Sequence, residues 1–180
     1  NVLYRAVRDH LRYPHRFVCL THEPEGLDPG IETMPVPDIG VPPSEWLKRG
    51  CWPKVALFAP EVFADDEIVL YLDLDLMIVG QLDPFIDLVR DRPAFYTLRE
   101  WNPPIWRVLP LAWRPDRGSQ GSIYVWRAGE QRHVYDHFRA NVDYVRENFW
   151  SDRFYLPNIA IGATYLPYEW TASFKNVCVR

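Results

Sequence analysis

The stretch EIVLYLDLDLMIVG, residues 67–80, constrains the fold more than any other part of the chain. Its apolar run, residues 68–72, lacks the alternation of apolar and polar side chains that marks a strand with one face in water. Such a run is typical of a central strand covered on both faces, as in the parallel sheets of α/β proteins. Asp73 and Asp75 follow it directly, although carboxylates are costly to bury unless they are paired, protonated or bound to a metal.

The rest of the chain is predicted to alternate strands with helices. Pro53 is a favoured first residue for a short helix, and the clearest helical periodicity covers residues 130–149. Further helices are predicted within residues 1–14 and 81–92. Strands are predicted at residues 17–21, 67–72, 93–98 and 122–129, with a short extended piece at 31–36. The tail from residue 155 is predicted to form short strands and turns. This alternation indicates an α/β protein with a mostly parallel central sheet. A length of 180 residues suits a single domain.

Composition excludes several classes of protein. A net charge of −4 argues against nucleic acid as a partner, because phosphates require a basic surface. No apolar stretch approaches the roughly 18 residues that span a bilayer, so no transmembrane segment is predicted. The three cysteines are odd in number, widely spaced and without a CxxC pair. This usage indicates a reducing compartment, predicts a cytoplasmic protein and excludes a zinc ribbon.

The spacing of the two aspartates predicts a shared ligand. In an extended backbone, residues i and i+2 point to the same side, so Asp73 and Asp75 are expected to converge. Ligands of open α/β sheets lie outside the carboxyl ends of the strands. A hard cation there, Mg²⁺ or Mn²⁺, takes carboxylate oxygens and keeps positions open for substrate phosphates. The simpler alternative is that both aspartates end the strand in solvent.

Two chemistries share this pattern. One is haloacid-dehalogenase-like phosphoryl transfer, with Asp73 as the nucleophile. That family has Thr or Val four positions after the first aspartate and places the motif near the N-terminus, whereas this chain has Met77 and a motif in mid-chain. The other chemistry is transfer of a sugar from a nucleotide-diphosphate donor, in which the aspartates hold the metal. The second chemistry fits the position of the motif better.

Six segments, in order, resemble GT-A glycosyltransferases of the glycogenin-like (family 8-like) kind found in uncharacterised bacterial proteins. They are FVCLTHEPEG, CWPKVALFAPEVF, VLYLDLDLMIVG, GSIYVWRAGE, SDRFYLP and YLPYEWTASFK, and they span almost the whole chain. The resemblance implies one Rossmann-like GT-A domain over residues 1–180. It also implies that the family's first strand and its extreme C-terminal segment lie outside this sequence.

The resemblance assigns roles to individual residues. Asp73 and Asp75 are expected to bind Mn²⁺ or Mg²⁺ on the diphosphate of the donor, for which a UDP-sugar is favoured. Lys54 is expected beside the phosphates or the sugar, and Asp152 against the transferred sugar, both in catalytic roles. The remaining donor-binding residues implied by the resemblance are Thr21, Leu74, Gln120, Gly121, Ser122 and Lys175.

Departures from the family pattern leave alternatives open. Gln120 stands where the family usually has Asn, Arg153 where it has Gln, and His22 where it has Asp. A catalytically inactive module that binds a sugar nucleotide therefore remains an alternative to a transferase. Lys54 can equally be a surface lysine, and Asp152 can equally cap a turn.

The long loop predicted over residues 99–121 is rich in Trp, Pro and Arg. Trp101, Trp106 and Trp113 could stack on an unknown acceptor, form a patch for a partner protein, or make a small hydrophobic cluster under the loop. The predicted function is a metal-dependent hexosyltransferase, retaining where the resemblance to glycogenin holds. No residue stands out as a general base, and the departing phosphate can take the proton of the acceptor.

Overall fold

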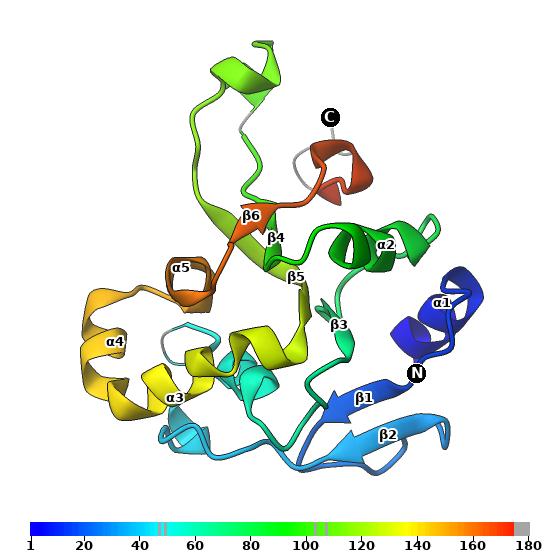
Figure 1. Cartoon of the computed structure of the whole chain (residues 1–180), viewed down its shortest axis with the longest axis vertical. Helices are drawn as coiled ribbons and strands as arrows, with labels where there is room; N and C mark the ends of the chain where they lie inside the picture. The colour runs from blue at the N-terminus through cyan, green and yellow to red at the C-terminus, as the bar shows by residue number, and fades with distance from the viewer. Residues whose placement is uncertain (47, 49, 103, 107, 175–180) are drawn as a thin grey trace.

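The protein is described from a computed structural model, which covers residues 1–46, 48, 50–102, 104–106 and 108–174. The described residues form an α/β protein with two sheets and helices packed around them (Figure 1). The smaller sheet pairs β1 (Phe17–Leu20) with β2 (Ile31–Met34) in parallel. The larger sheet has the order β3 (Ile68–Leu72), β5 (Ser119–Arg127), β4 (Tyr96–Arg99) and β6 (Thr164–Tyr165).

The larger sheet is mixed, so the expectation of a mostly parallel sheet is wrong. β5 runs antiparallel to both β3 and β4, and only the β4–β6 pair is parallel. The reason is that, among the described residues, only two short 3₁₀ turns and no α-helix lie between β4 and β5. Parallel neighbours need a crossover connection, usually a helix, whereas β4 and β5 are joined by a loop and therefore form a wide hairpin.

Helices pack on both faces of the sheets. α1 (Val2–His10) and α2 (Asp83–Asp91) pack through one hydrophobic cluster, which includes Leu3, Val7 and Val89. The 3₁₀ helix Trp52–Phe58 packs through the other cluster with α3 (His133–Ala140). The shorter 3₁₀ turns are Pro43–Glu45, Pro104–Trp106, Leu111–Trp113, Ala128–Gln131 and Tyr168–Trp170.

The helix predicted over residues 130–149 is divided in two. α3 ends at Ala140 and α4 (Val142–Asn148) begins after Asn141, whose φ of −134° and ψ of 31° are not helical. The break changes the direction of the chain while keeping the apolar stripe inward, so that Val134, Phe138 and Val145 are all buried. The apolar spacing was read correctly, but it did not reveal the break.

Helix α5 (Asp152–Ile159) lies partly where strands and turns were predicted, and it contains Pro157, a residue that disfavours a helix interior. A proline at that position deprives the carbonyl of Arg153 of its usual helical donor. The hydroxyl of Ser119 donates to that carbonyl instead. Tyr155 and Leu156 are fully buried against the core, so tertiary packing and one side-chain hydrogen bond maintain a helix that the local sequence disfavours. Among the described residues, no helix has the length and apolar character needed to cross a membrane.

Candidate functional site

Asp73 leaves β3 in a turn rather than in extended backbone. The amide of Asp73 donates to the carbonyl of Ser122 on β5 (2.9 Å), and the amide of Leu76 donates back to the carbonyl of Asp73 (3.3 Å). The geometric reason for expecting Asp73 and Asp75 to converge is therefore wrong. The side chain of Asp73 is one-quarter exposed, whereas Asp75 is exposed and Leu74 is 84% exposed.

Lys54 lies between Asp73 and Asp152 at the centre of the site. Its Nζ lies 2.9 Å from Oδ1 of Asp73 and 3.8 Å from Oδ2 of Asp152. It also donates to the carbonyl of Gly121 at 2.8 Å. The side chain is only 14% exposed and lies over the ring of Tyr71, with Nζ 5.2 Å from the centroid. Lys54 is therefore a largely buried cation held by carboxylates, and the interpretation as an ordinary surface lysine is wrong.

Asp152 is the most deeply buried acid of the site. It is the first residue of α5, is 4% exposed, and accepts a hydrogen bond from the hydroxyl of Tyr124 (3.2 Å). Burial raises the pKa of Asp152 above its usual value, while Lys54, Tyr124 and backbone amides of Arg153 and Cys51 partly offset this rise. The backbone hydrogen bonds from Arg153 and Cys51 fit the capping interpretation, and the Nζ of Lys54 at 3.8 Å adds an ion pair to it.

Two tyrosines complete the site, and the sequence interpretation did not single them out. The hydroxyl of Tyr71 donates to Oδ1 of Asp73, and the rings of Tyr71 and Tyr124 stack with centroids 5.6 Å apart. Burial raises the pKa of both phenols well above the usual value, with the neighbouring Asp73 and Asp152 as further causes. Both hydroxyls therefore stay protonated and act as donors. The period-2 rule was the available signal, because Tyr71 precedes Asp73 by two residues.

A bulge in β5 brings the backbone to Lys54. Thr97 of β4 pairs with Tyr124, but the next residue, Leu98, pairs with Gln120. Gly121 and two following residues are thus extra on β5 and bend that strand towards the site. A Cβ on Gly121 would lie 2.9 Å from the Tyr124 hydroxyl and 3.1 Å from Oδ2 of Asp152, so only glycine fits there without a shift. The side chain of Gln120 accepts from the amide of Ser122 (2.8 Å) and so stabilises the bulge.

The charge of the site favours an added cation. Asp73 and Asp152 share the single ammonium group of Lys54, and Asp75 lies two residues beyond Asp73 in the same turn. Among the described residues, no group of three His, Cys, Asp or Glu side chains is arranged to hold a metal. Mg²⁺ is often bound through one or two carboxylates together with substrate phosphates. The described residues therefore do not form a complete protein cage, and a cation at Asp73 and Asp75 would need ligands from a bound substrate.

Several predicted residues lie away from this cluster. Thr21 lines a separate hollow of about 280 Å³ with His22 and Met34. Trp101 is buried and packs edge-on against Tyr168, as in the hydrophobic-cluster interpretation of the loop, whereas Trp106 and Trp113 are 44% and 74% exposed. Lys175 lies outside the described residues.

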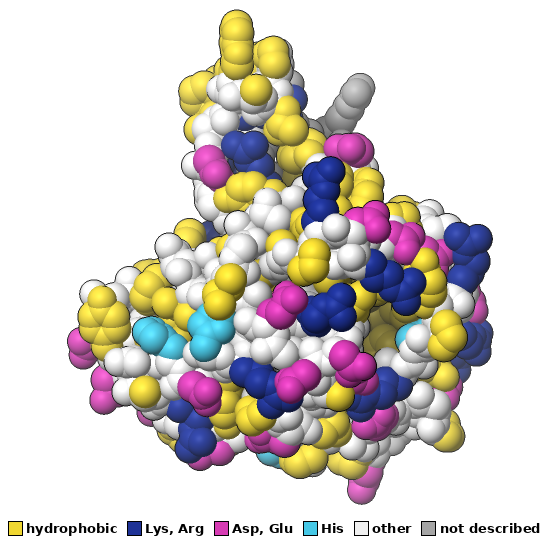
Figure 2. Space-filling model, viewed as in Figure 1, with side chains coloured by type: hydrophobic (Ala, Val, Ile, Leu, Met, Phe, Trp, Pro, Cys, Tyr) yellow, Lys and Arg dark blue, Asp and Glu magenta, His cyan; other side chains and the backbone are white. Residues whose placement is uncertain are grey.

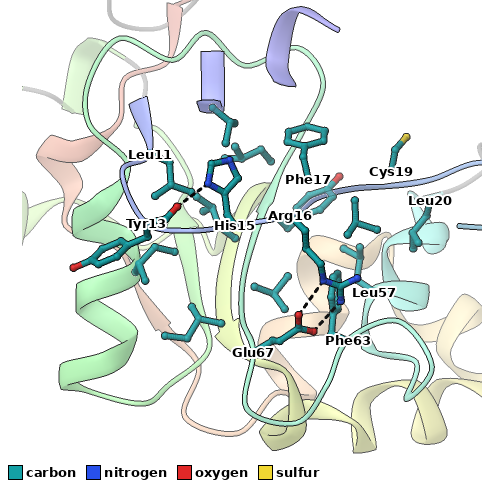
Figure 3. Close-up of a pocket in the computed structure, with 18 of the residues that line it drawn as sticks. Leu11, Tyr13, His15, Arg16, Phe17, Cys19, Leu20, Leu57, Phe63 and Glu67 are labelled. Atoms are coloured by element: carbon teal, nitrogen blue, oxygen red, sulfur yellow. Dashed lines mark hydrogen bonds and ion pairs between the residues drawn. The ribbon is translucent and has the colours of Figure 1, made fainter. Parts of the chain in front are cut away.

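A groove of about 640 Å³ opens beside the cluster, between β1 and β3 (Figure 3). Lys54, Tyr71 and Leu74 line it at the end nearest the site, and apolar side chains line most of the remainder. The cluster thus adjoins a cavity large enough for a ligand. Comparisons with protein-family models, curated proteins and solved structures found no match for this chain.

Proposed function

We propose that this chain is a metal-dependent glycosyltransferase that moves a hexose from a nucleotide-diphosphate sugar, with a UDP-sugar as the favoured donor. The main support is one observation: Lys54 bridges Asp73 and Asp152 beside a glycine-containing bulge. Of these groups, Lys54 lines the end of the groove, and the two acids and the carbonyl of Gly121 contact its ammonium group. The ordered sequence segments that resemble GT-A enzymes are the second support.

The positions of Lys54 and Asp152 suggest a separate role for each in the proposed transfer. Lys54 is placed to interact with a departing diphosphate, because its ammonium group is already held at the end of the groove by Asp73. Asp152 is placed to stabilise positive charge that develops on the sugar, since Tyr124 and Lys54 fix its Oδ2. Mn²⁺ or Mg²⁺ at Asp73 and Asp75 would supply further charge neutralisation for the leaving group. Catalysis would then be chiefly electrostatic and positional.

No general base is required in this scheme. Asp152 is 4% exposed and its Oδ2 contacts Tyr124 and Lys54, so an acceptor hydroxyl has little access to this carboxylate. In a retaining reaction the oxygen of the leaving phosphate can take the proton of the acceptor hydroxyl. The exposed Trp106 and Trp113 are candidates for contact with that acceptor.

The direct test is calorimetric titration with UDP and with GDP, each with and without Mn²⁺, followed by an assay for hydrolysis of UDP-sugars. We expect binding that depends on Mn²⁺, slow hydrolysis of one UDP-sugar, and loss of at least tenfold in nucleotide affinity on Asp73→Asn. The control is Asp91→Asn, which changes an exposed acid of α2 in the same way. Nucleotide binding without hydrolysis of any UDP-sugar would support the inactive module, and absence of any metal-dependent nucleotide binding would contradict the proposed transferase.

The same protein tests the phosphoryl-transfer alternative. A phosphorylated Asp73, detected by mass spectrometry after incubation with a small phosphate donor, would support a haloacid-dehalogenase-like enzyme. The structure gives this alternative less support, because β3 pairs only with the antiparallel β5 among the described residues and Asp73 is hydrogen-bonded by Tyr71 as well as Lys54. We therefore expect Asp73 to remain unmodified.

A further inference from the structure

An exposed apolar surface lies at the end of the loop between β4 and β5. The described part of this loop, within residues 100–118, projects from the body as an arm (Figure 1). Its outer part, residues 104–106 and 108–113, consists entirely of Pro, Ala, Val, Leu, Ile and Trp. Figure 2 shows hydrophobic side chains gathered there. The tip of the arm consists of its large exposed apolar side chains, which are Ile105 (75%), Trp106 (44%), Val108 (83%), Leu111 (38%) and Trp113 (74%).

The composition of the tip distinguishes between kinds of partner. Single exposed apolar side chains are common on proteins, whereas a contiguous patch marks an interaction surface. A protein–protein interface surrounds its apolar centre with a polar rim and carries about one hydrogen bond per 100–200 Å². Apart from the indole N–H groups of its two tryptophans, the described outer part of the arm offers no side-chain hydrogen-bonding group. A lipid surface needs no such groups, so the tip fits lipid better than a shaped protein surface.

The backbone of the outer part is suited to the boundary between water and lipid. The amide of Leu109 donates to the carbonyl of Trp106 (3.2 Å), and the amide of Trp113 donates to the carbonyl of Pro110 (2.9 Å). Pro104 and Pro110 have no amide hydrogen to satisfy. Irregular backbone exposed to lipid does not occur within the hydrocarbon core, because its polar groups lack partners there. The arm is therefore expected at interfacial depth, where Trp is enriched and water still reaches the backbone.

The arm carries positive charge on an acidic chain. Residues 99–118 contain four Arg and two acidic residues, a net charge of +2, whereas the whole chain has −4 and the remainder therefore −6. Nε of Arg114 donates to the carbonyl of Leu109 (2.9 Å), and Nη1 of Arg117 donates to the carbonyl of Trp101 (2.8 Å). These bonds hold two guanidinium groups between the tip and the body.

The acidic side chains of the arm lie at its base and are paired. Oε2 of Glu100 lies 2.5 Å from Nη1 of Arg153, and Oδ1 of Asp116 accepts a hydrogen bond from the hydroxyl of Tyr165 (3.0 Å). The negative charge of the arm is therefore confined to the end that joins the body. An anionic surface would repel the acidic body and attract the arm, so contact with such a surface would be made through the arm.

We propose that the tip inserts into the interfacial layer of an anionic phospholipid bilayer, with Arg114 and Arg117 facing the lipid phosphates. Tryptophan is enriched at membrane–water interfaces, and each arginine near an anionic surface adds to the attraction. The protein then lies on the membrane without spanning it. The inference does not rest on the proposed transferase activity. Where that activity holds, the acceptor that Trp106 and Trp113 contact lies at the membrane surface.

The test is flotation of residues 1–180 with lipid vesicles, in the absence of nucleotide and metal. One set of vesicles is phosphatidylcholine alone, and the other is phosphatidylcholine mixed with phosphatidylglycerol. We expect binding to the mixed vesicles, and binding to phosphatidylcholine alone that is at least about tenfold weaker, because the surface potential that attracts the arginines is absent there. Failure to bind either set would overturn the proposal, whatever the outcome of the nucleotide titrations. Equal binding to both sets would overturn the part assigned to Arg114 and Arg117.

Two substitutions separate the apolar and the charged contributions. Trp113→Ala should weaken binding to mixed vesicles at least about fivefold, because one interfacial indole is lost. The matched control is Trp150→Ala, which removes a similarly exposed tryptophan (70% against 74%) outside the arm and should leave binding unchanged. Arg117→Gln should weaken binding to the mixed vesicles only. Circular dichroism checks that each variant is folded, and equal effects of Trp113→Ala and Trp150→Ala would contradict the proposal.

A second readout reports the depth of the tip. Lipids brominated near the start of the acyl chains quench the fluorescence of tryptophans that reach them. We expect quenching of the bound protein, and loss of most of it when Trp106 and Trp113 are both replaced by Phe, which preserves the apolar tip. Binding without quenching would place the contact at the headgroups alone and overturn insertion. A dimer or a complex with a soluble protein that requires Trp113, in a chain that does not bind vesicles, would assign the tip to a protein contact and overturn the proposal.

Discussion

At the scale of single residues, the candidate site depends on how one lysine is neutralised. Lys54 is largely buried, and its ammonium group has carboxylate oxygens of Asp73 and Asp152 at 2.9 and 3.8 Å. A buried ion pair contributes little net stability, but removing one partner leaves the other charge without compensation. The identity of residue 54 therefore matters to folding as well as to binding.

Lys54→Met is expected to lower the free energy of unfolding by about 1–3 kcal/mol, because two poorly hydrated carboxylates lose their shared cation. Urea denaturation at neutral pH measures the loss. Lys48→Met is the control, since Lys48 is exposed and its replacement should change stability by less than about 0.5 kcal/mol. Equal stability of both variants would show that the Lys54 interactions contribute nothing to the fold.

The hydrogen bonds of Asp83 predict how the free energy of unfolding depends on pH. Its carboxylate accepts from Nε of Arg12 (2.7 Å) and from the Arg12 amide (2.9 Å), and these interactions lower the pKa of Asp83 below its usual value. Because the folded pKa lies below the unfolded value of about 3.9, the contribution is present above that value and is lost as the pH falls through the folded pKa. We expect Asp83→Asn to flatten the fall of unfolding free energy below about pH 4. Denaturation at several pH values measures it, and an Asp91→Asn variant should retain the wild-type slope.

At the scale of elements, local sequence patterns predicted where the strands lie better than they predicted which strands pair with each other. The apolar runs that gave β1, β3, β4 and β5 are local, and all four strands are present. The choice of β5 as the neighbour of β3 depends on contacts between residues about 50 positions apart, which no local pattern contains. A local pattern does not predict the whole of α5, because the penalty of Pro157 is local, whereas its compensation by Ser119 is not.

The contrast between local patterns and distant contacts also applies to the residues of the candidate site. Asp73 was selected from its position at the end of an apolar strand, and Lys54, Gly121 and Asp152 through the family resemblance. The structure brings these four residues together. Tyr71 and Tyr124 were missed because a tyrosine in an apolar strand looks like core. The extended-backbone argument for the convergence of Asp73 and Asp75 was wrong because the chain turns at Asp73, and the backbone hydrogen bond from Leu76 that forms this turn is not visible in the composition of the strand.

The bulge in β5 is the element whose geometry the site depends on most. Gly121→Ala adds a Cβ that would lie 2.9 Å from the Tyr124 hydroxyl, 3.1 Å from Oδ2 of Asp152 and 3.4 Å from Nζ of Lys54. We expect this variant to lose about 1–3 kcal/mol of stability and at least tenfold in affinity for Mn²⁺ and UDP, because these groups must move apart. Chemical denaturation and calorimetry measure the two effects. Gly80→Ala is the matched control, since nothing lies within 4 Å of its added Cβ. Equal stability and affinity of the two variants would mean that the bulge accommodates a Cβ without displacing these groups.

At the scale of the whole molecule, the described part of the loop between β4 and β5, within residues 100–118, projects from the body as an arm (Figures 1 and 2). Its base is closed by hydrogen bonds from the Glu100 amide to the Gly118 carbonyl (2.8 Å) and from Asn102 to the Pro115 carbonyl (3.1 Å). Its outer part carries exposed apolar side chains, including Ile105, Val108 and Trp113. The arm is therefore attached to the hairpin through its base, and its tip contributes little buried surface to the core.

Replacing residues 103–113 by Asn-Gly, a pair suited to a tight hairpin turn, keeps the contact of Arg114 with Tyr168 and should shift the thermal midpoint by less than about 3 °C. The bonds at the base remain, and a shorter loop costs less entropy to close. Trp101→Ala is the contrasting variant: Trp101 is 8% exposed and packs against Tyr168, so its loss should cost about 3 kcal/mol. Thermal unfolding followed by circular dichroism separates the two cases. A large drop for the arm replacement would show that the tip is part of the core. Unchanged binding of UDP, together with loss of transfer to an acceptor, would instead assign the arm to the acceptor side of the site.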